Sequence, residues 1–178
     1  MKQLIDLKNV GKATLEDLHL LNIYSMIYFF LIIQCILFLF MILHDWVAFP
    51  PLTNLAALKK AHSFKFRLMG SFVNGILVLV PLIVTFLSFG SPFPLWSRLL
   101  FTGIYGLLTI GTITAWWIPY FGGRYLIHGN QAGFEEYRDT HSFLPPIGDH
   151  IVPNTLHVIL HIQVWLCFGL SLYWLFHG

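Results

Sequence analysis

Histidine gives this sequence its clearest capacity for chemistry. His157 and His161 lie four positions apart in residues 155–176, a stretch long and apolar enough to cross a bilayer. Residues four apart share one face of a helix, so both imidazoles point the same way. Ionisable side chains within a membrane-spanning helix mark functional sites by default, because burying them in lipid costs free energy. This pair is therefore the first candidate for a binding or catalytic centre.

Other polar side chains could complete a metal centre around this pair. Two imidazoles at positions i and i+4 can chelate one ion, and a third ligand gives a set suited to zinc or iron. The candidates for completing the site are His150, His141, His44 and His62 as ligands and Asp149 as an orienting carboxylate. The segment HVILH lacks the glutamate of HExxH, so it contains no metalloprotease base. We expect a histidine-rich polar site that binds a divalent transition metal. In an enzyme, the metal-bound water would act on a lipid-soluble substrate.

Three other interpretations of the same residues remain open. Haem in a membrane four-helix bundle is held between histidines on facing helices, whereas His161 is the only histidine clearly inside an expected span. A channel or transporter would need several copies of this chain, a homo-oligomer, and no expected span contains Asp, Glu, Lys or Arg. In the third interpretation the histidines are structural, with ring nitrogens bonded to water or to backbone carbonyls.

The composition places these residues in a lipid bilayer. Of 178 residues, 57% are hydrophobic and 10% are charged, whereas soluble domains carry about 25% charged residues. Four apolar stretches, at about residues 23–43, 69–87, 99–119 and 155–176, approach or exceed the roughly 20 residues that a spanning helix needs. We therefore expect an all-α membrane protein, with a four-helix transmembrane bundle formed by residues 23–178.

Four spans place both termini on one side of the membrane and the two long connectors on the other. Most of the histidines then fall on the connector side: His44, His62, His128, His141, His150, His157 and His161. The cluster of basic residues from Lys59 to Arg67 makes the positive-inside rule favour a cytoplasmic connector side. A nucleic-acid contact by residues 1–22 would require the opposite, so the orientation stays open. We expect an integral, multi-pass protein of a bacterial-type plasma membrane.

Residues 1–22 precede the first span and have a different pattern. Leucines recur at helical spacing, and Gly11 interrupts them. Thr14 and Asp17 resemble the start of a second helix, because a hydroxyl followed three positions later by an acid can cap a helix. The pattern predicts an amphipathic N-terminal helical hairpin with a turn at residues 9–11.

Residues 5–24 resemble a single helix-hairpin-helix motif. The residues that carry the resemblance are Leu7, the turn Asn9-Val10-Gly11-Lys12, and then Leu18, Leu21 and Ile23. In that family the amides of the turn and a nearby lysine contact phosphates, so the resemblance assigns this role to Gly11 and Lys12. Asn22 stands where the family has a second glycine, and such units normally bind DNA in pairs. Nucleic acid is therefore not the expected partner. The alternatives are a non-catalytic scaffold or effector that binds a cytosolic protein, or a helix lying on the membrane.

Overall fold

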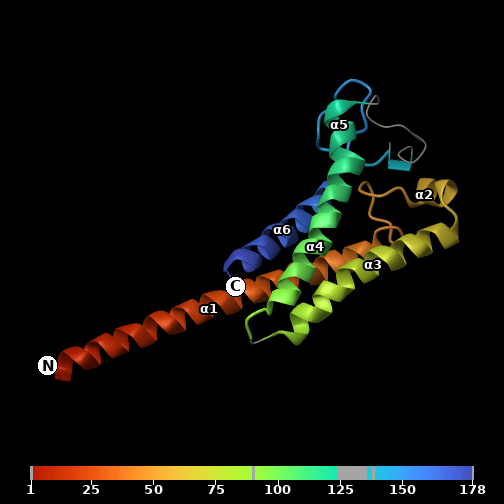
Figure 1. Ribbon diagram of the computed structural model, residues 1–178. Coiled ribbons are helices and arrows are strands. Elements are labelled where there is room, and N and C mark those ends of the chain that lie inside the picture. The colour runs from red at the N-terminus through yellow and green to blue at the C-terminus, as the bar shows by residue number, and fades with distance from the viewer. Residues whose placement is uncertain (1, 90, 124–135, 138, 178) are drawn as a thin grey trace.

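The computed structural model describes residues 2–89, 91–123, 136–137 and 139–177, with side chains from residue 21 onward (Figure 1). The elements are α1 (Lys2–Leu43), α2 (Leu55–Ala61), α3 (Phe64–Leu87), α4 (Leu95–Thr112), the π-helical turn η1 (Ile113–Trp117), α5 (Ile118–Gly122) and α6 (Thr155–His177). Within these ranges there is no strand. The prediction of an all-α fold is confirmed.

Four helical segments are long and apolar enough to cross a membrane, as predicted. They are Leu21–Leu43, Phe64–Leu87, Leu95–Gly122 and Thr155–His177. The second begins five residues earlier than predicted, because the side chain of Ser63 accepts a hydrogen bond from the backbone N–H of Phe66 and caps the helix there. The third is longer than predicted, because α4, η1 and α5 follow one another without a break.

The four segments pack as two helical hairpins. The α1–α3 and α4–α6 pairs make the most extensive contacts, while α1 also meets α6 and α3 meets α4. The core between them is apolar and includes Phe30 and Leu37 of α1, Val78 of α3, Phe101 of α4 and Val164 of α6. Large apolar side chains cover the outer faces as well. A bundle that is apolar both inside and outside is suited to a lipid environment.

The N-terminal helical hairpin is not present. Helix α1 runs without interruption from Lys2 to Leu43, so there is no turn at residues 9–11. A glycine inside a helix costs only about 1 kcal/mol relative to alanine, and the Leu, Lys, Ala and Glu residues on both sides favour helix. The continuous helix also removes the helix-hairpin-helix arrangement, and with it the basis for assigning phosphate contacts to Gly11 and Lys12.

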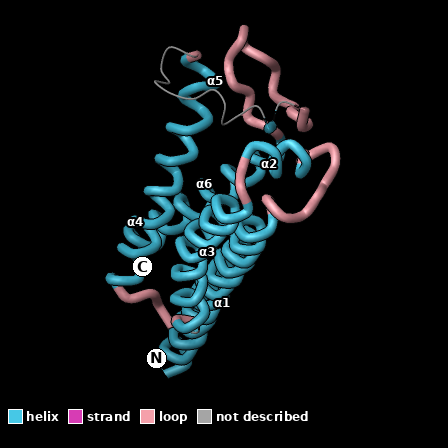
Figure 2. The backbone as a smooth tube through the Cα atoms, turned by 90° about the vertical axis from the view of Figure 1, so that its right-hand side faces the viewer, coloured by secondary structure: helices cyan, strands magenta, loops and turns pink. Residues whose placement is uncertain are grey.

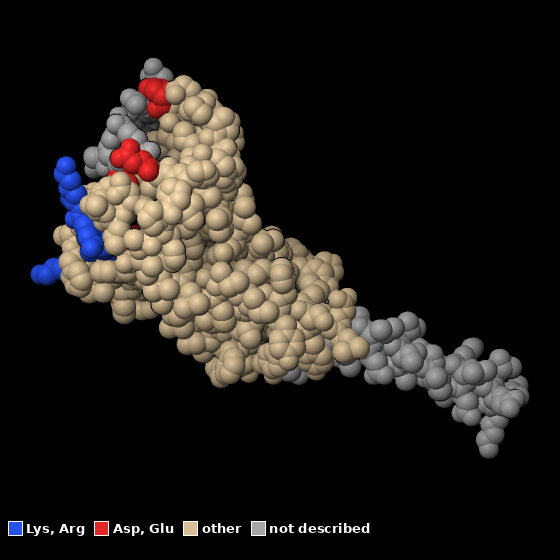
Figure 3. Space-filling view, turned by 180° about the vertical axis from the view of Figure 1, so that it is seen from behind, with Lys and Arg blue, Asp and Glu red and all other residues tan. Residues whose placement is uncertain are grey.

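The connectors gather at one end of the bundle, called here the connector end. It contains α2, α5 and the loops at residues 44–54 and 139–154 (Figures 1 and 2). Only the short connection between α3 and α4 lies at the opposite end, and both chain ends lie away from the connectors (Figure 2). In the face shown in Figure 3, the Lys, Arg, Asp and Glu side chains drawn in colour also gather at the connector end. The polar chemistry of the described chain is concentrated there.

Candidate functional site

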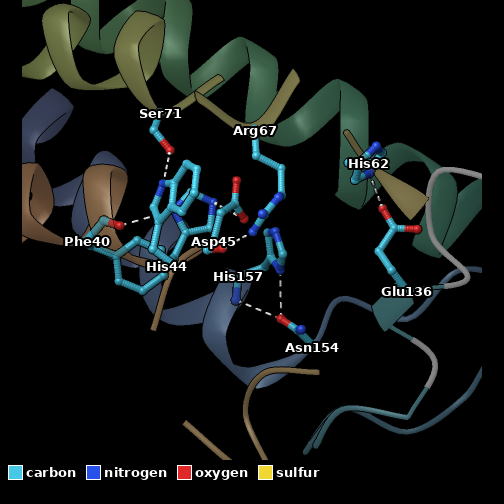
Figure 4. Close-up of polar contacts among 10 residues, drawn as sticks. Phe40, His44, Asp45, His62, Arg67, Ser71, Glu136, Asn154 and His157 are labelled. Atoms are coloured by element: carbon cyan, nitrogen blue, oxygen red, sulfur yellow. Dashed lines mark hydrogen bonds and ion pairs between the residues drawn. The ribbon is translucent and has the colours of Figure 1, made fainter. Parts of the chain in front are cut away.

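Asn154 begins α6 and fixes the orientation of His157. Its side-chain oxygen Oδ1 accepts a hydrogen bond from the backbone N–H of His157 at 2.9 Å, the usual bond of a helix N-cap residue. The same oxygen lies 2.7 Å from Nδ1 of the His157 ring (Figure 4). Because this atom already accepts from a backbone N–H, it is the amide oxygen, and Nδ1 must be the donor. In the neutral ring, Nε2 is then an unprotonated hydrogen-bond acceptor.

The second connector holds Asn154 in place. Asn154 is 2% exposed, and its Nδ2 donates a hydrogen bond to Oγ1 of Thr140 at 2.9 Å. The backbone of His141 donates to Pro51 O of the first connector, and Thr155 donates to His141 O, both at 2.9 Å. The orientation of His157 therefore depends on contacts that join both connectors to α6.

His157 lines a cavity between the first connector and the start of α6. The cavity measures about 20 Å³, and a water molecule needs roughly 10–15 Å³ by the same measure. Its polar lining comes from three parts of the chain and consists of His44, Asp45, Thr53, Asn54, Tyr137, Asn154 and His157. The rest of the lining is apolar and consists of Leu52, Leu55, Leu58 and Leu156. The cavity therefore has room for about one water-sized group, in a largely apolar surrounding that contains a few hydrogen-bonding side chains.

Charged groups border this cavity on the side of the first connector. His44 Nδ1 lies 3.1 Å from Phe40 O, and His44 Nε2 lies 3.2 Å from Asp45 Oδ1. Both ring nitrogens thus face oxygen atoms that can accept hydrogen bonds. Arg67 is buried next to them: its Nη1 donates to Asp45 O at 2.9 Å, and its Cζ lies 4.6 Å from the ring centre of Trp46. Figure 4 shows this group beside His157.

The π-helical turn η1 places two tryptophans against the histidines of α6. The ring centre of Trp116 lies 4.1 Å from that of His157, and Nε1 of Trp117 donates to Nδ1 of His161 at 3.1 Å. A π-helical turn contains more residues than an α-helical turn, and such turns are frequent at functional sites. Because indole N–H can only donate, Nδ1 of neutral His161 is unprotonated and its proton is on Nε2. The two histidines therefore have opposite tautomers.

These tautomers do not favour the predicted metal chelate. A histidine ligand must offer a lone pair to the metal, and the described bonds leave one only on Nε2 of His157. The Nδ1 lone pair of His161 is used by Trp117, and the ring centres of the two histidines are 6.2 Å apart. Nor does the described part of the chain bring together three His, Cys, Asp or Glu side chains that could hold an ion. No cluster of three potential ligands among these residues supports the predicted zinc or iron centre, which stays a prediction.

The remaining predicted site residues lie outside the cavity. His150 contacts Tyr120 O through Nδ1 at 2.8 Å, and His141 pairs with Thr155 Oγ1 at 2.8 Å. His62 Nε2 lies 2.7 Å from Oε1 of Glu136, which joins the two connectors. Asp149 is exposed, and His128 lies outside the described residues. Of the predicted ligands, only His44 and His157 line the cavity.

Sequence reasoning missed Asn154 and Tyr137 as site residues. The position of Asn154 directly before an apolar helix is an N-cap signal. Tyr137 has no comparable local pattern. Burial raises the pKa of the Tyr137 hydroxyl above its ordinary value, and the carboxylates of Asp45 and Glu136 add to the rise. Tyr137 therefore stays a neutral hydroxyl at physiological pH.

Comparisons with models of protein families, with curated proteins and with solved structures find no match to this chain. The site must be interpreted from its geometry. That geometry combines an oriented imidazole, an adjacent carboxylate and a neutral phenol around a small cavity. Such a set can accept a hydrogen bond or a proton from a small molecule.

Proposed function

We propose that this multi-pass membrane protein binds a small, hydrogen-bond-donating molecule in the cavity at the connector end. Nε2 of His157 is the acceptor. One observation carries the proposal: Oδ1 of Asn154 accepts both the backbone N–H and the Nδ1 proton of His157. This leaves an unprotonated nitrogen on a residue that lines a small, largely apolar cavity. Hydroxyl and amine groups are the ligand chemistry that fits this acceptor.

The same arrangement would support general-base chemistry. A base must lie within hydrogen-bond reach of the proton it removes, and an oriented neutral histidine is the commonest choice. Asn154 would hold the ring, as a hydrogen-bonded side chain does in catalytic triads. The substrate of such an enzyme would present its hydroxyl or amine at the membrane surface.

The experiment is a ¹⁵N NMR titration of histidine-labelled protein in nanodiscs. Methanol and methylamine are the probes, because each places one donor group in a small volume. We expect an unprotonated Nε2 resonance for His157 that shifts and saturates with a probe, while the His161 resonances do not. In the Leu55→Phe variant, which narrows the cavity, the saturable shift should disappear while the His157 tautomer is kept.

Two results would overturn this proposal. The first is the absence of a saturable shift with either probe in the folded protein. The second is a His157 resonance with the proton on Nε2, which would mean that Asn154 does not set the tautomer. Elemental analysis of untagged protein is the matching check on the metal interpretation. Stoichiometric zinc or iron that disappears in a His157→Ala/His161→Ala variant would replace our proposal with a metal site.

A second candidate function is supported by the length of α1. The apolar span begins at Leu21, whereas α1 begins at Lys2, so roughly 28 Å of helix precedes the span at 1.5 Å per residue. A scaffold or effector could use this segment to bind a cytosolic protein. Deleting residues 2–20 should then abolish binding of that partner and leave the probe-dependent shift of His157 unchanged. A deletion that leaves partner binding unchanged would exclude this role.

A further inference from the structure

Three exposed lysines form a compact group at the connector end. Lys59 and Lys60 lie in the last turn of α2, and Lys65 lies in the first turn of α3. We call Lys59, Lys60 and Lys65 the basic cluster. Figure 3 shows blue side chains at the connector end, whereas the bundle surface beyond it is tan on the face that is shown. On this face the blue side chains therefore lie at one end of an apolar surface, where red Asp and Glu side chains are also visible.

The start of α3 places the basic cluster at the edge of the membrane. Phe64 is the first residue of an apolar span, and the side chains of Phe64 and Phe66 on either side of Lys65 are 62% and 63% exposed. Exposed aromatic rings at the end of a span lie at the level of the lipid headgroups. A lysine between them can extend its ammonium group to the same level while its aliphatic stem stays in apolar surroundings.

The elements that carry the basic cluster are held in place by hydrogen bonds and packing. The side chain of Asn54 accepts from the N–H of Ala57 at 3.1 Å and caps α2. The buried side chain of Leu58 anchors the same helix against the cavity. On the second connector, the carboxylate of Glu136 bonds His62 rather than a lysine of the basic cluster. The three ammonium groups are thus presented by fixed helices.

We propose that the basic cluster binds the phosphate-bearing headgroups of anionic phospholipids. Each lysine near an anionic membrane surface strengthens association about fivefold, so three together give roughly a hundredfold preference for anionic lipid. Because lysine and arginine are retained on the cytoplasmic side, the basic cluster favours a cytoplasmic connector end. This orientation is incompatible with the binding of a cytosolic protein by the N-terminal part of α1, so the two proposals exclude each other. The proposal does not depend on the ligand of the cavity.

The experiment measures which lipids the purified protein retains. Protein is equilibrated with equal amounts of phosphatidylglycerol and phosphatidylcholine, and the bound lipids are counted by native mass spectrometry. We expect a strong preference for phosphatidylglycerol that salt weakens. A Lys59→Gln/Lys60→Gln/Lys65→Gln variant should lose roughly a hundredfold of this preference, whereas the matched Lys→Arg variant at the same positions should keep it.

Folding is controlled by comparing unfolding curves of all three proteins in phosphatidylcholine alone, where they should coincide. Equal retention of phosphatidylglycerol by the wild-type protein and the folded glutamine variant would overturn the proposal. Loss of the preference in the arginine variant would overturn it as well, because the proposed interaction depends on charge. The inferred orientation of the connector end is checked with the Lys60→Cys variant. The accessibility of this cysteine to a labelling reagent is measured in intact cells. Labelling from outside the cell would contradict the orientation.

Discussion

The Asn154→Ala substitution is the most direct test of how the site is built. Asn154 is buried, caps α6 through the backbone N–H of His157, accepts the Nδ1 proton of the same residue and donates to Thr140. Alanine removes all three bonds at once. We expect both a loss of stability and a change in the protonation pattern of His157.

The size of the loss can be estimated from the three bonds. Replacing an asparagine N-cap by alanine costs about 1 kcal/mol. Leaving the buried Nδ1–H of His157 without an acceptor costs about 1–3 kcal/mol. The bond to Thr140 contributes about 1 kcal/mol. Because the three share one side chain they are not additive, and we expect a total of about 3 kcal/mol. Asn154→Asp is the matched control: it keeps the acceptor for both N–H groups and loses only the bond to Thr140, so it should lose less stability than the alanine variant.

The assay is reversible unfolding in mixed micelles with increasing SDS, followed by circular dichroism, together with the ¹⁵N spectrum of His157. The alanine variant should unfold at a lower SDS fraction than the aspartate variant, and its Nδ1 proton should become free to move to Nε2. An alanine variant within about 0.5 kcal/mol of the wild type, with an unchanged His157 spectrum, would refute our reasoning about Asn154.

Three further predictions concern neighbouring parts of the connector end. Gly123→Ala should destabilise the protein by about 1–3 kcal/mol in thermal unfolding, because Gly123 has φ +77° and an added Cβ would lie 2.6 Å from His150 Nε2. Gly103→Ala, with no neighbour within 4 Å, is the control and should not destabilise it. Trp117→Phe should cost about 1 kcal/mol and alter the ¹⁵N spectrum of His161; an unchanged spectrum would contradict the bond to Trp117. For Tyr137, the folded-state pKa is raised above the ordinary value of 10.0, so the unfolded state loses its proton first. The stabilisation that the buried Tyr137 hydroxyl provides should be complete below pH 10 and decline as the pH rises above this value. Unfolding curves of the Tyr137→Phe variant over the same pH range should lack that decline.

The four spans follow from sequence because they depend on local properties. A helix in lipid satisfies its own backbone hydrogen bonds, so a sufficiently long apolar stretch is enough to specify a span. The sequence also predicts that His157 and His161 share one face of the helix, because this depends only on helical geometry. The N-terminal hairpin was mispredicted because Gly11 is a weak signal. One glycine does not end a helix whose neighbouring residues favour it.

Composition and periodicity are enough to predict a helical chain with four apolar segments long enough to cross a membrane, and to place most histidines on the connectors. Which histidines come together depends on the tertiary structure. His44 and His157 line one cavity because two connectors fold against each other, and local periodicity does not encode contacts between segments so far apart in the chain. The tertiary structure also decided the tautomers, because each histidine takes its state from one partner, Asn154 or Trp117. Trp117, the partner of His161, lies in the π-helical turn of a different span. The two histidines, whose spacing in the sequence suggests a metal chelate, therefore form two different hydrogen-bonding groups.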